Sequence, residues 1–186
     1  MNTTMRCTCS GQGILKPMTL APQLPSRQCE ACEGSLLALD AYRRWRDASP
    51  TQDAQSASTV IHGLLAVEDS AGARACPQCN RLMQRLRVST DAPDFRVDRC
   101  SPCQVVWFDR GEWQALALNG LAGRLDEVLS DGWQRQLRQG ESRARREAAL
   151  IERHGQERLQ ELARIRAWLD EQPDGDELLS LLRAGW

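Results

Sequence analysis

Residues 76–103 read CPQCNRLMQRLRVSTDAPDFRVDRCSPC, and this stretch decides the fold. Two Cys-x2-Cys pairs stand at its ends, Cys76 with Cys79 and Cys100 with Cys103, separated by twenty residues. Between the pairs, apolar residues alternate with polar ones on both sides of a turn-like Asp-Ala-Pro sequence. This alternation is typical of a hairpin of two short strands. We therefore expect a hairpin that brings the two cysteine pairs together.

A second cysteine quartet precedes this stretch, so the chain contains an internal repeat. The quartet consists of Cys7-x-Cys9, then nineteen residues, then Cys29-x2-Cys32. Its later pair aligns with the later pair of the other quartet at an offset of 71 residues. The repeat predicts two related modules of similar construction.

The similarity continues beyond the cysteines. The same offset places Tyr42 over Trp113, and each unit ends in a short apolar step followed by an amphipathic segment. In the second unit Asp109 precedes Glu112 by three residues, which predicts a helix N-cap with its reciprocal carboxylate. In the first unit Pro17 lies within the apolar sequence ILKPMTL and predicts an edge strand.

Four thiolates in a tetrahedron are a preferred ligand set for structural Zn²⁺. Two cysteine pairs joined by a hairpin supply that set, and a module of about 40 residues buries too little apolar surface to fold without help. With four thiolates and no open ligand position, each metal is expected to be structural. We predict two Zn²⁺ ions per chain, bound by Cys7, Cys9, Cys29, Cys32, Cys76, Cys79, Cys100 and Cys103.

Other interpretations of the cysteines stay open. The short Cys7-x-Cys9 pair is expected to lose backbone N–H contacts to sulfur, and the first site could then be held by Cys29, Cys32 and one cysteine of that pair. His62 could substitute as a ligand there. The Cys-Pro-Gln-Cys pair of the second quartet has a thioredoxin-type form, but a redox role needs a βαβ context that the sequence lacks. The simplest alternative is a set of free buried thiols.

Three motifs of the second quartet carry a resemblance to a known family: CPQC at 76–79, VDRCSPC at 97–103 and VWFDRGEW at 106–113. They resemble the bacterial "transcription factor zinc-finger" family, whose members are zinc ribbons similar to the one in transcription factor IIB. Together with a diluted first copy, the resemblance covers roughly residues 5–48 and 74–119. It implies zinc binding and a ribbon fold.

The second copy departs from the family's pattern after each cysteine pair. Gln104 and Val105 stand where the family has two glycines, and Asn80 stands where glycine is common. Asn tolerates a left-handed backbone better than Gln or Val. We therefore expect a distorted turn after Cys103.

The remaining sequence predicts a helical tail. Residues 124–171 contain ten Arg and ten Asp or Glu, with apolar residues at an approximate 4-3 spacing. This pattern favours a long amphipathic helix or a helical hairpin that could self-associate as a coiled coil, although Gly140 and Gly155 interrupt it. The fold class is therefore small α+β zinc-ribbon modules in tandem, β-hairpins with zinc knuckles, followed by a mainly α-helical tail. The predicted divisions are a first ribbon with a short helix at 1–48, a linker at 49–73, a second ribbon with a short helix at 74–119, and the tail at 120–186.

Composition and charge limit the classes of function that we expect for this chain. The formal net charge is −1, no apolar run is long enough to span a bilayer, and the first ten residues carry no apolar signal segment, so we expect a cytoplasmic protein without a membrane partner. Asp109 and Glu112 have no histidine near them in the sequence, and we expect no enzymatic activity. The aromatic motif around them is interpreted as packing over the hairpin, with a docking edge as the other interpretation.

We therefore predict a non-enzymatic adaptor that binds protein through the tail or a ribbon face, or that self-associates through the tail. The alternative is a nucleic-acid-binding or transcription-associated regulator, in which arginines contact phosphates. The candidate arginines form a hairpin set and a second small cluster: Arg81, Arg85, Arg87, Arg96 and Arg99, then Arg43, Arg44 and Arg46. Because residues 74–113 hold seven Arg against five acidic residues, and a thiolate zinc site adds −2, nucleic acid is not the favoured partner.

Overall fold

The computed structural model describes residues 5–48, 67–89 and 94–185. The predicted turn at 91–93, most of the predicted linker and His62 lie outside the described residues. The chain divides into two compact units, one ending at Leu137 and the other beginning at Arg138.

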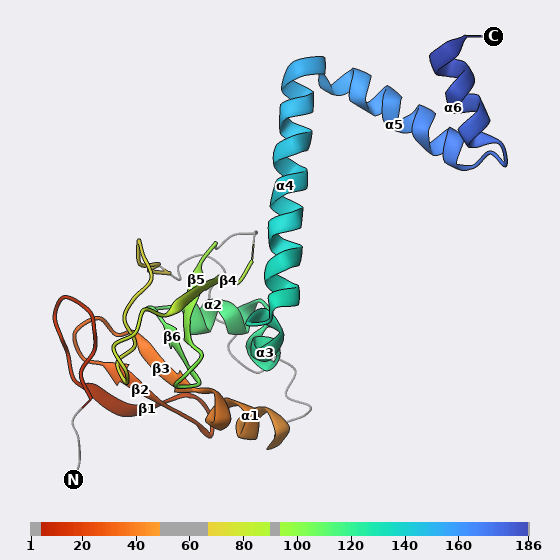
Figure 1. Ribbon diagram of the computed structural model, residues 1–186. Coiled ribbons are helices and arrows are strands. Elements are labelled where there is room, and N and C mark those ends of the chain that lie inside the picture. The colour runs from red at the N-terminus through yellow and green to blue at the C-terminus, as the bar shows by residue number, and fades with distance from the viewer. Residues whose placement is uncertain (1–4, 49–66, 90–93, 186) are drawn as a thin grey trace. The chain divides into compact units, whose positions relative to one another are not determined.

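The first unit is built on one antiparallel sheet of six strands in the order β1-β2-β3-β6-β5-β4 (Figure 1). Its strands are β1 Leu15–Ala21, β2 Leu24–Cys29, β3 Ser35–Ala38, β4 Gln84–Arg87, β5 Arg96–Cys100 and β6 Val105–Phe108. The predicted hairpin is confirmed, because β4 pairs with β5 between the second set of cysteines. The predicted edge strand is also confirmed, because β1 carries Pro17 at the free edge, where a missing N–H costs no ladder bond.

The two repeats meet where β3 pairs with β6. Leu36 pairs with Trp107, and its neighbour Leu37 pairs with Val106. Leu36 and Trp107 are equivalent positions of the repeat, so the pairing has local two-fold pseudosymmetry. Both cysteine modules therefore belong to a single sheet. The sequence predicted two modules in tandem and did not indicate that their strands would pair.

A short helix follows the last strand of each repeat, as the amphipathic segments predict. These helices are α1 Leu39–Ala48 and α2 Glu112–Leu118. Tyr42 and Trp113, the equivalent aromatic residues, are both buried in the larger hydrophobic core. The Tyr42 hydroxyl also accepts a hydrogen bond of 2.9 Å from the backbone N–H of Leu125. This contact ties the first repeat to the segment that follows the second one.

The predicted cap of α2 is half right. The backbone N–H of Asp109 donates to Oε2 of Glu112 at 2.7 Å, which is the reciprocal bond of a capping box. The Asp109 side chain does not cap the helix, and Gly111 occupies the N-cap position. Instead, Oδ1 of Asp109 accepts a hydrogen bond from Nε1 of Trp107 at 2.8 Å. A buried indole N–H needs a partner, and Asp109 supplies it.

Residues after α2 close the other edge of the sheet. The 3-10 turn Ala122–Arg124 and α3 Leu125–Val128 lead into α4 Asp131–His154. Near the start of α4, Nε2 of Gln134 donates to the carbonyl of Arg87 at 2.8 Å. Its Oε1 accepts the N–H of Arg87 at 3.3 Å. An amide side chain thus takes the place of a neighbouring strand at β4.

The second unit contains the rest of α4, then α5 Gln156–Asp170 and α6 Gly175–Ala184. The helical character of the tail is confirmed, and the Pro173-Asp-Gly sequence separates the last two helices as expected. Gly155, with φ 84° and ψ 147°, breaks the predicted 4-3 pattern into two helices. A coiled coil stays a prediction. None of the helices in the described part of the chain has the length and apolar character needed to cross a membrane.

The tight packing at the β3–β6 pairing predicts that a larger residue at position 34 destabilises the sheet. Gly34 lies directly against the Trp107 ring, and a methyl group at this position would overlap the indole carbons. We expect Gly34→Ala to lower the free energy of unfolding by about 1–3 kcal/mol, as overpacking of a tight core does. Urea unfolding followed by tryptophan fluorescence measures the change. Gly123→Ala is the matched control, because its new methyl group would meet no atom within 4 Å; equal losses in both variants would contradict the prediction.

Candidate metal centres

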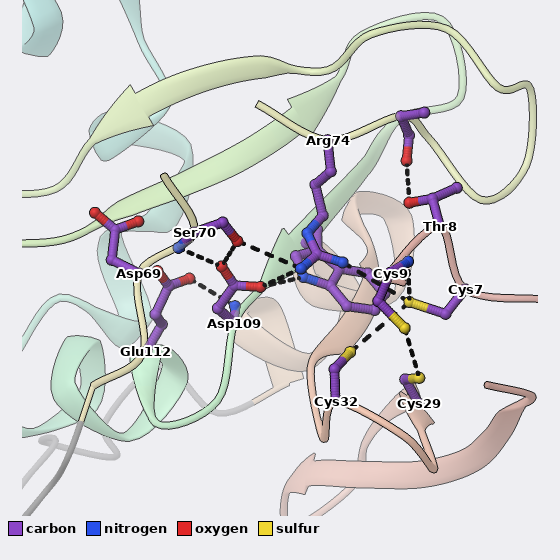
Figure 2. Close-up of polar contacts among 12 residues, drawn as sticks. Cys7, Thr8, Cys9, Cys29, Cys32, Asp69, Ser70, Arg74, Asp109 and Glu112 are labelled. Carbon is purple, nitrogen blue, oxygen red and sulfur yellow. Dashed lines mark hydrogen bonds and ion pairs between the residues drawn. The ribbon is translucent and has the colours of Figure 1, made fainter. Parts of the chain in front are cut away.

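The first cysteine quartet converges on one point. Cys7 and Cys9 lie in the loop before β1, Cys29 ends β2, and Cys32 lies in the turn that follows (Figure 2). The four Sγ atoms lie within 4.8 Å of one another. The Sγ atoms of Cys7 and Cys32 are 3.8 Å apart, and so are those of Cys9 and Cys29. All four predicted ligands of the first site are therefore brought together.

The second quartet has the same construction. Cys76 and Cys79 precede β4, Cys100 ends β5, and Cys103 lies in the turn before β6. Their Sγ atoms also lie within 4.8 Å of one another, with 3.6 Å between those of Cys79 and Cys100. All eight cysteines of the two quartets are free of disulfides.

The sulfur spacing fits a tetrahedral metal ion. A Zn–S distance of about 2.3 Å gives a tetrahedron with edges of about 3.8 Å. The closest sulfur pairs, at 3.6 and 3.8 Å, match that edge. Thiolate sulfur is a soft ligand, and four of them in a tetrahedron suit zinc. Each quartet can therefore hold one metal ion.

The thiols differ in acidity within each quartet, because each contains thiols with a raised pKa and one with a lowered pKa: Cys7 and Cys32 against Cys9, and Cys76 and Cys103 against Cys79. Burial raises the pKa of the Cys7 thiol far above its usual range, so this sulfur needs a cation to stay ionised. The backbone N–H of Arg81 lowers the pKa of the exposed Cys79 thiol to about 7. A metal ion would displace the protons in either case, because the thiolate is the ligand form.

Backbone amides support the sulfur atoms. The N–H groups of Ala31 and Gln78 donate to the Sγ of Cys29 and Cys76, each at 3.4 Å. The expectation that the short Cys7-x-Cys9 pair loses such contacts is wrong. The N–H of Cys9 itself donates to Sγ of Cys7 at 3.4 Å, because the bond spans only two residues and survives the loss of the third.

The residue after each Cys-x2-Cys pair has a left-handed backbone. The φ angles are 55° at Glu33, 58° at Asn80 and 53° at Gln104. Gln104 thus adopts the conformation that a glycine would have favoured. The turn after Cys103 differs in its hydrogen bond: the N–H of Gln104 reaches the carbonyl of Ser101, three residues back, at 3.3 Å, whereas that of Asn80 reaches the carbonyl of Cys76, four residues back, at 2.8 Å.

Arg74 joins the first quartet to the second repeat, a role that no sequence pattern predicted. Its Nη1 donates to Sγ of Cys7 at 3.7 Å, and its Nη2 pairs with Oδ1 of Asp109 at 2.9 Å (Figure 2). The guanidinium also lies 4.6 Å from the ring centroid of Trp107, within the range of a cation–π contact. Nearby, the hydroxyl of Thr8 donates to the carbonyl of Ala75 at 2.7 Å. The only signal in the sequence was the position of Arg74, two residues before Cys76.

A third group of possible ligands consists of Asp69, Asp109 and Glu112, whose carboxylate oxygens also lie within 4.8 Å of one another. Arginines already balance this group, since Arg74 pairs with Asp109 and Arg85 pairs with Asp69. Burial raises the pKa of Glu112 to about 9, so this side chain is a neutral acid near pH 7. The cluster is thus an ion-pair network beneath α2, and it offers a cation little net negative charge.

Comparison with known proteins finds no match: no family model fits the sequence, and no curated protein or solved structure is significantly similar to it.

The position of Arg74 predicts that it strengthens the first metal site. A Zn²⁺ ion with four thiolates carries a net charge of −2, and the Arg74 side chain, only 14% exposed, offsets it. We expect Arg74→Met to weaken zinc binding at the first site by about tenfold, which corresponds to about 1.4 kcal/mol. Competition with a chromophoric chelator measures the loss.

Two controls make this measurement specific. Arg81→Met removes an exposed arginine beside the second quartet and should leave the first site unchanged. In a Cys7→Ser background, which lacks the first site, Arg74→Met should no longer affect zinc affinity. An equal loss of affinity in that background would show that Arg74 acts on the whole fold.

The burial of Glu112 predicts a pH dependence. Its pKa is about 9 in the folded chain against a usual value of 4.5, so the folded state holds this proton more tightly. The stabilisation is complete below the unfolded pKa and is lost as the pH rises through the folded one. Between about pH 6.5 and 8.5, wild type should lose up to about 1.4 kcal/mol per pH unit relative to Glu112→Gln. Urea unfolding at several pH values measures this difference; a constant difference would show that Glu112 is ionised in the fold.

Proposed function

We propose that the chain is a structural zinc protein: two Zn²⁺ ions hold one rigid sheet of two joined zinc ribbons, which serves as a protein-interaction adaptor without enzymatic activity. The observation that carries the proposal is the closure of both quartets, each with four sulfurs within 4.8 Å of one another. Four protein ligands fill the coordination sphere of Zn²⁺, so a metal held in this way has no position for a substrate.

Ion pairs between hairpin arginines and nearby carboxylates support an adaptor over a nucleic-acid binder. Arg85 and Arg96 both pair with Asp69, the latter at 3.4 Å, and Arg87 pairs with Asp94 at 2.5 Å. A phosphate would have to compete with these carboxylates for each guanidinium. Three of the five hairpin arginines are thus paired with carboxylates, which weakens the basic stripe that is typical of nucleic-acid binders.

The arginines of the second cluster, on α1, also form ion pairs with carboxylates. Arg43 and Arg46 pair with Asp126 at 2.9 and 2.7 Å. Arg44 pairs with Asp40 at 3.0 Å. The two pairs with Asp126 fasten α1 to α3, so the cluster contributes to the fold and leaves little unpaired charge for phosphate.

The surface between the two quartets supports a protein partner. A cleft of about 930 Å³ lies between the Cys7–Cys9 loop and the Cys76–Cys79 turn. Arg6 is the one charged residue that lines it. Its other polar side chains, besides the cysteines, are Thr8, Gln12, Gln78 and Asn80. Such a lining provides hydrogen bonds to a polypeptide backbone without attracting a polyanion.

The metal content tests the proposal directly. We expect two zinc ions per chain by elemental analysis of the purified protein. Cys29→Ser and Cys100→Ser should each reduce the ratio to one, because each removes a thiolate from a different quartet, whereas Ser101→Ala should keep it at two. A ratio that does not respond to either cysteine would contradict two independent thiolate sites.

The same preparations test the alternative function. Phosphate contacts give a binding constant that falls steeply with salt concentration. Fluorescence anisotropy with labelled DNA and RNA should show no tight binding with such a slope. Tight binding that weakens steeply with salt would favour the nucleic-acid regulator over the adaptor.

A further inference from the structure

The first cysteine loop, residues 7–9, contacts the segment that leads into the second quartet. The hydroxyl of Thr8 donates to the carbonyl of Ala75 at 2.7 Å, and Ala75 directly precedes the first cysteine of the second quartet. One residue earlier, Nη1 of Arg74 donates to Sγ of Cys7 at 3.7 Å (Figure 2). Two consecutive residues of the second repeat therefore bind two consecutive residues of the first.

The residue that accepts the Thr8 hydroxyl helps to form the turn of the second quartet. Ala75 forms an antiparallel bridge with Leu82, and the N–H of Cys76 donates to the carbonyl of Arg81 at 2.8 Å. These contacts close a short hairpin whose turn carries Cys76 and Cys79. Holding Ala75 in place therefore holds this turn in place.

The loop of the first quartet is a hairpin of the same kind. Arg6 forms an antiparallel bridge with Ile14, and the N–H of Cys7 donates to the carbonyl of Gly13 at 2.8 Å. An isolated hairpin of two short strands is marginally stable in water. Each cysteine hairpin therefore depends on further contacts for its order, and the Thr8–Ala75 hydrogen bond is a contact that both hairpins share.

The buried cysteines of the two quartets also pack in one hydrophobic cluster. Each of the four cysteine pairs contributes one buried member to the cluster that contains Trp107: Cys7, Cys29, Cys76 and Cys100. Protein interiors are close-packed, so ordering one group of side chains restricts its neighbours. The two quartets are thus joined through their core as well as through their surface loops.

We propose that the two metal sites are positively coupled, so that zinc in either quartet raises the affinity of the other, and that the Thr8–Ala75 hydrogen bond carries a large share of this coupling. Metal binding orders the residues that supply its ligands. Once the 7–9 loop is ordered, Thr8 holds Ala75, and the second quartet loses less conformational entropy when it closes. Linkage makes the effect equal in the other direction. The inference rests on the proposed structural zinc function and adds an interaction between its two sites.

Zinc affinities of the intact chain and of single-site variants measure the coupling. Cys100→Ser leaves the first site and Cys29→Ser leaves the second, so the product of their two dissociation constants is the value expected without coupling. Competition with a chromophoric chelator gives the corresponding product for wild type. We expect the wild-type product to be smaller by about tenfold, within the usual range for coupled sites.

Thr8→Val tests the contact that carries the coupling, because valine keeps the branched shape and lacks the hydroxyl. We expect this variant to reduce the tenfold ratio to about threefold. The same substitution in each single-site chain should change the zinc affinity by less than about twofold, because the partner site is then empty. Ser10→Ala is the matched control: it removes an exposed hydroxyl from the segment after Cys9 and should leave the ratio unchanged.

Three outcomes would overturn the proposal. They are equal products for wild type and the single-site chains, an equal loss of coupling in Ser10→Ala and Thr8→Val, and a loss of affinity from Thr8→Val that is as large in the single-site chains as in wild type. Elemental analysis at saturating zinc separates this inference from the proposed function. Fewer than two ions per wild-type chain would contradict both, whereas two ions with equal products would contradict the coupling alone.

Discussion

The antiparallel pairing of β3 with β6 is the contact on which the rest of the first unit depends. It places Leu36 opposite Trp107, at equivalent positions of the repeat, and so turns two small cysteine modules into one sheet. The indole of Trp107 is buried between Gly34 and the guanidinium of Arg74. The hydrogen bond from the indole N–H to Asp109 then fixes the start of the segment that leads to α2. The two metal centres consequently share one supporting framework.

The shared sheet adds the buried apolar surface that each module lacks when it is alone. A ribbon of about 40 residues buries too little apolar surface to offset the entropy of ordering its chain. In the joined sheet, Tyr42 from the first repeat and Trp113 from the second belong to one hydrophobic core. A metal ion in each quartet would therefore support the packing of the core. Most of the quartet cysteines belong to one hydrophobic cluster of the first unit, and the residues packed with α1 and α2 belong to the other.

Local sequence patterns predicted the local structure well. Cysteine spacing predicted which sulfurs come together, alternation predicted the β4–β5 hairpin, and Pro17 predicted the edge strand. The missed features join residues that are distant in the sequence, where spacing carries no signal. Arg74 reaches Cys7 across 67 positions, and Gln134 reaches the edge of β4 across 47.

The tail shows the same division between local and distant information. A 4-3 spacing predicted helix correctly because it reflects the helical period, but it could not show which of the two glycines breaks the helix: α4 continues through Gly140 and ends before Gly155. The two units also treat their charges differently. In the first unit, Arg43, Arg74 and Arg85 pair with acidic residues of the same unit. In the second unit, ion pairs join residues of the same helix, as in Arg145 with Glu141 and Arg166 with Asp170, and several apolar side chains of α5 and α6 are exposed. Ion pairs three or four residues apart add only about 0.2–0.5 kcal/mol each to an isolated helix. The helices of the second unit therefore draw less stability from their charges than the first unit draws from pairs that join different elements.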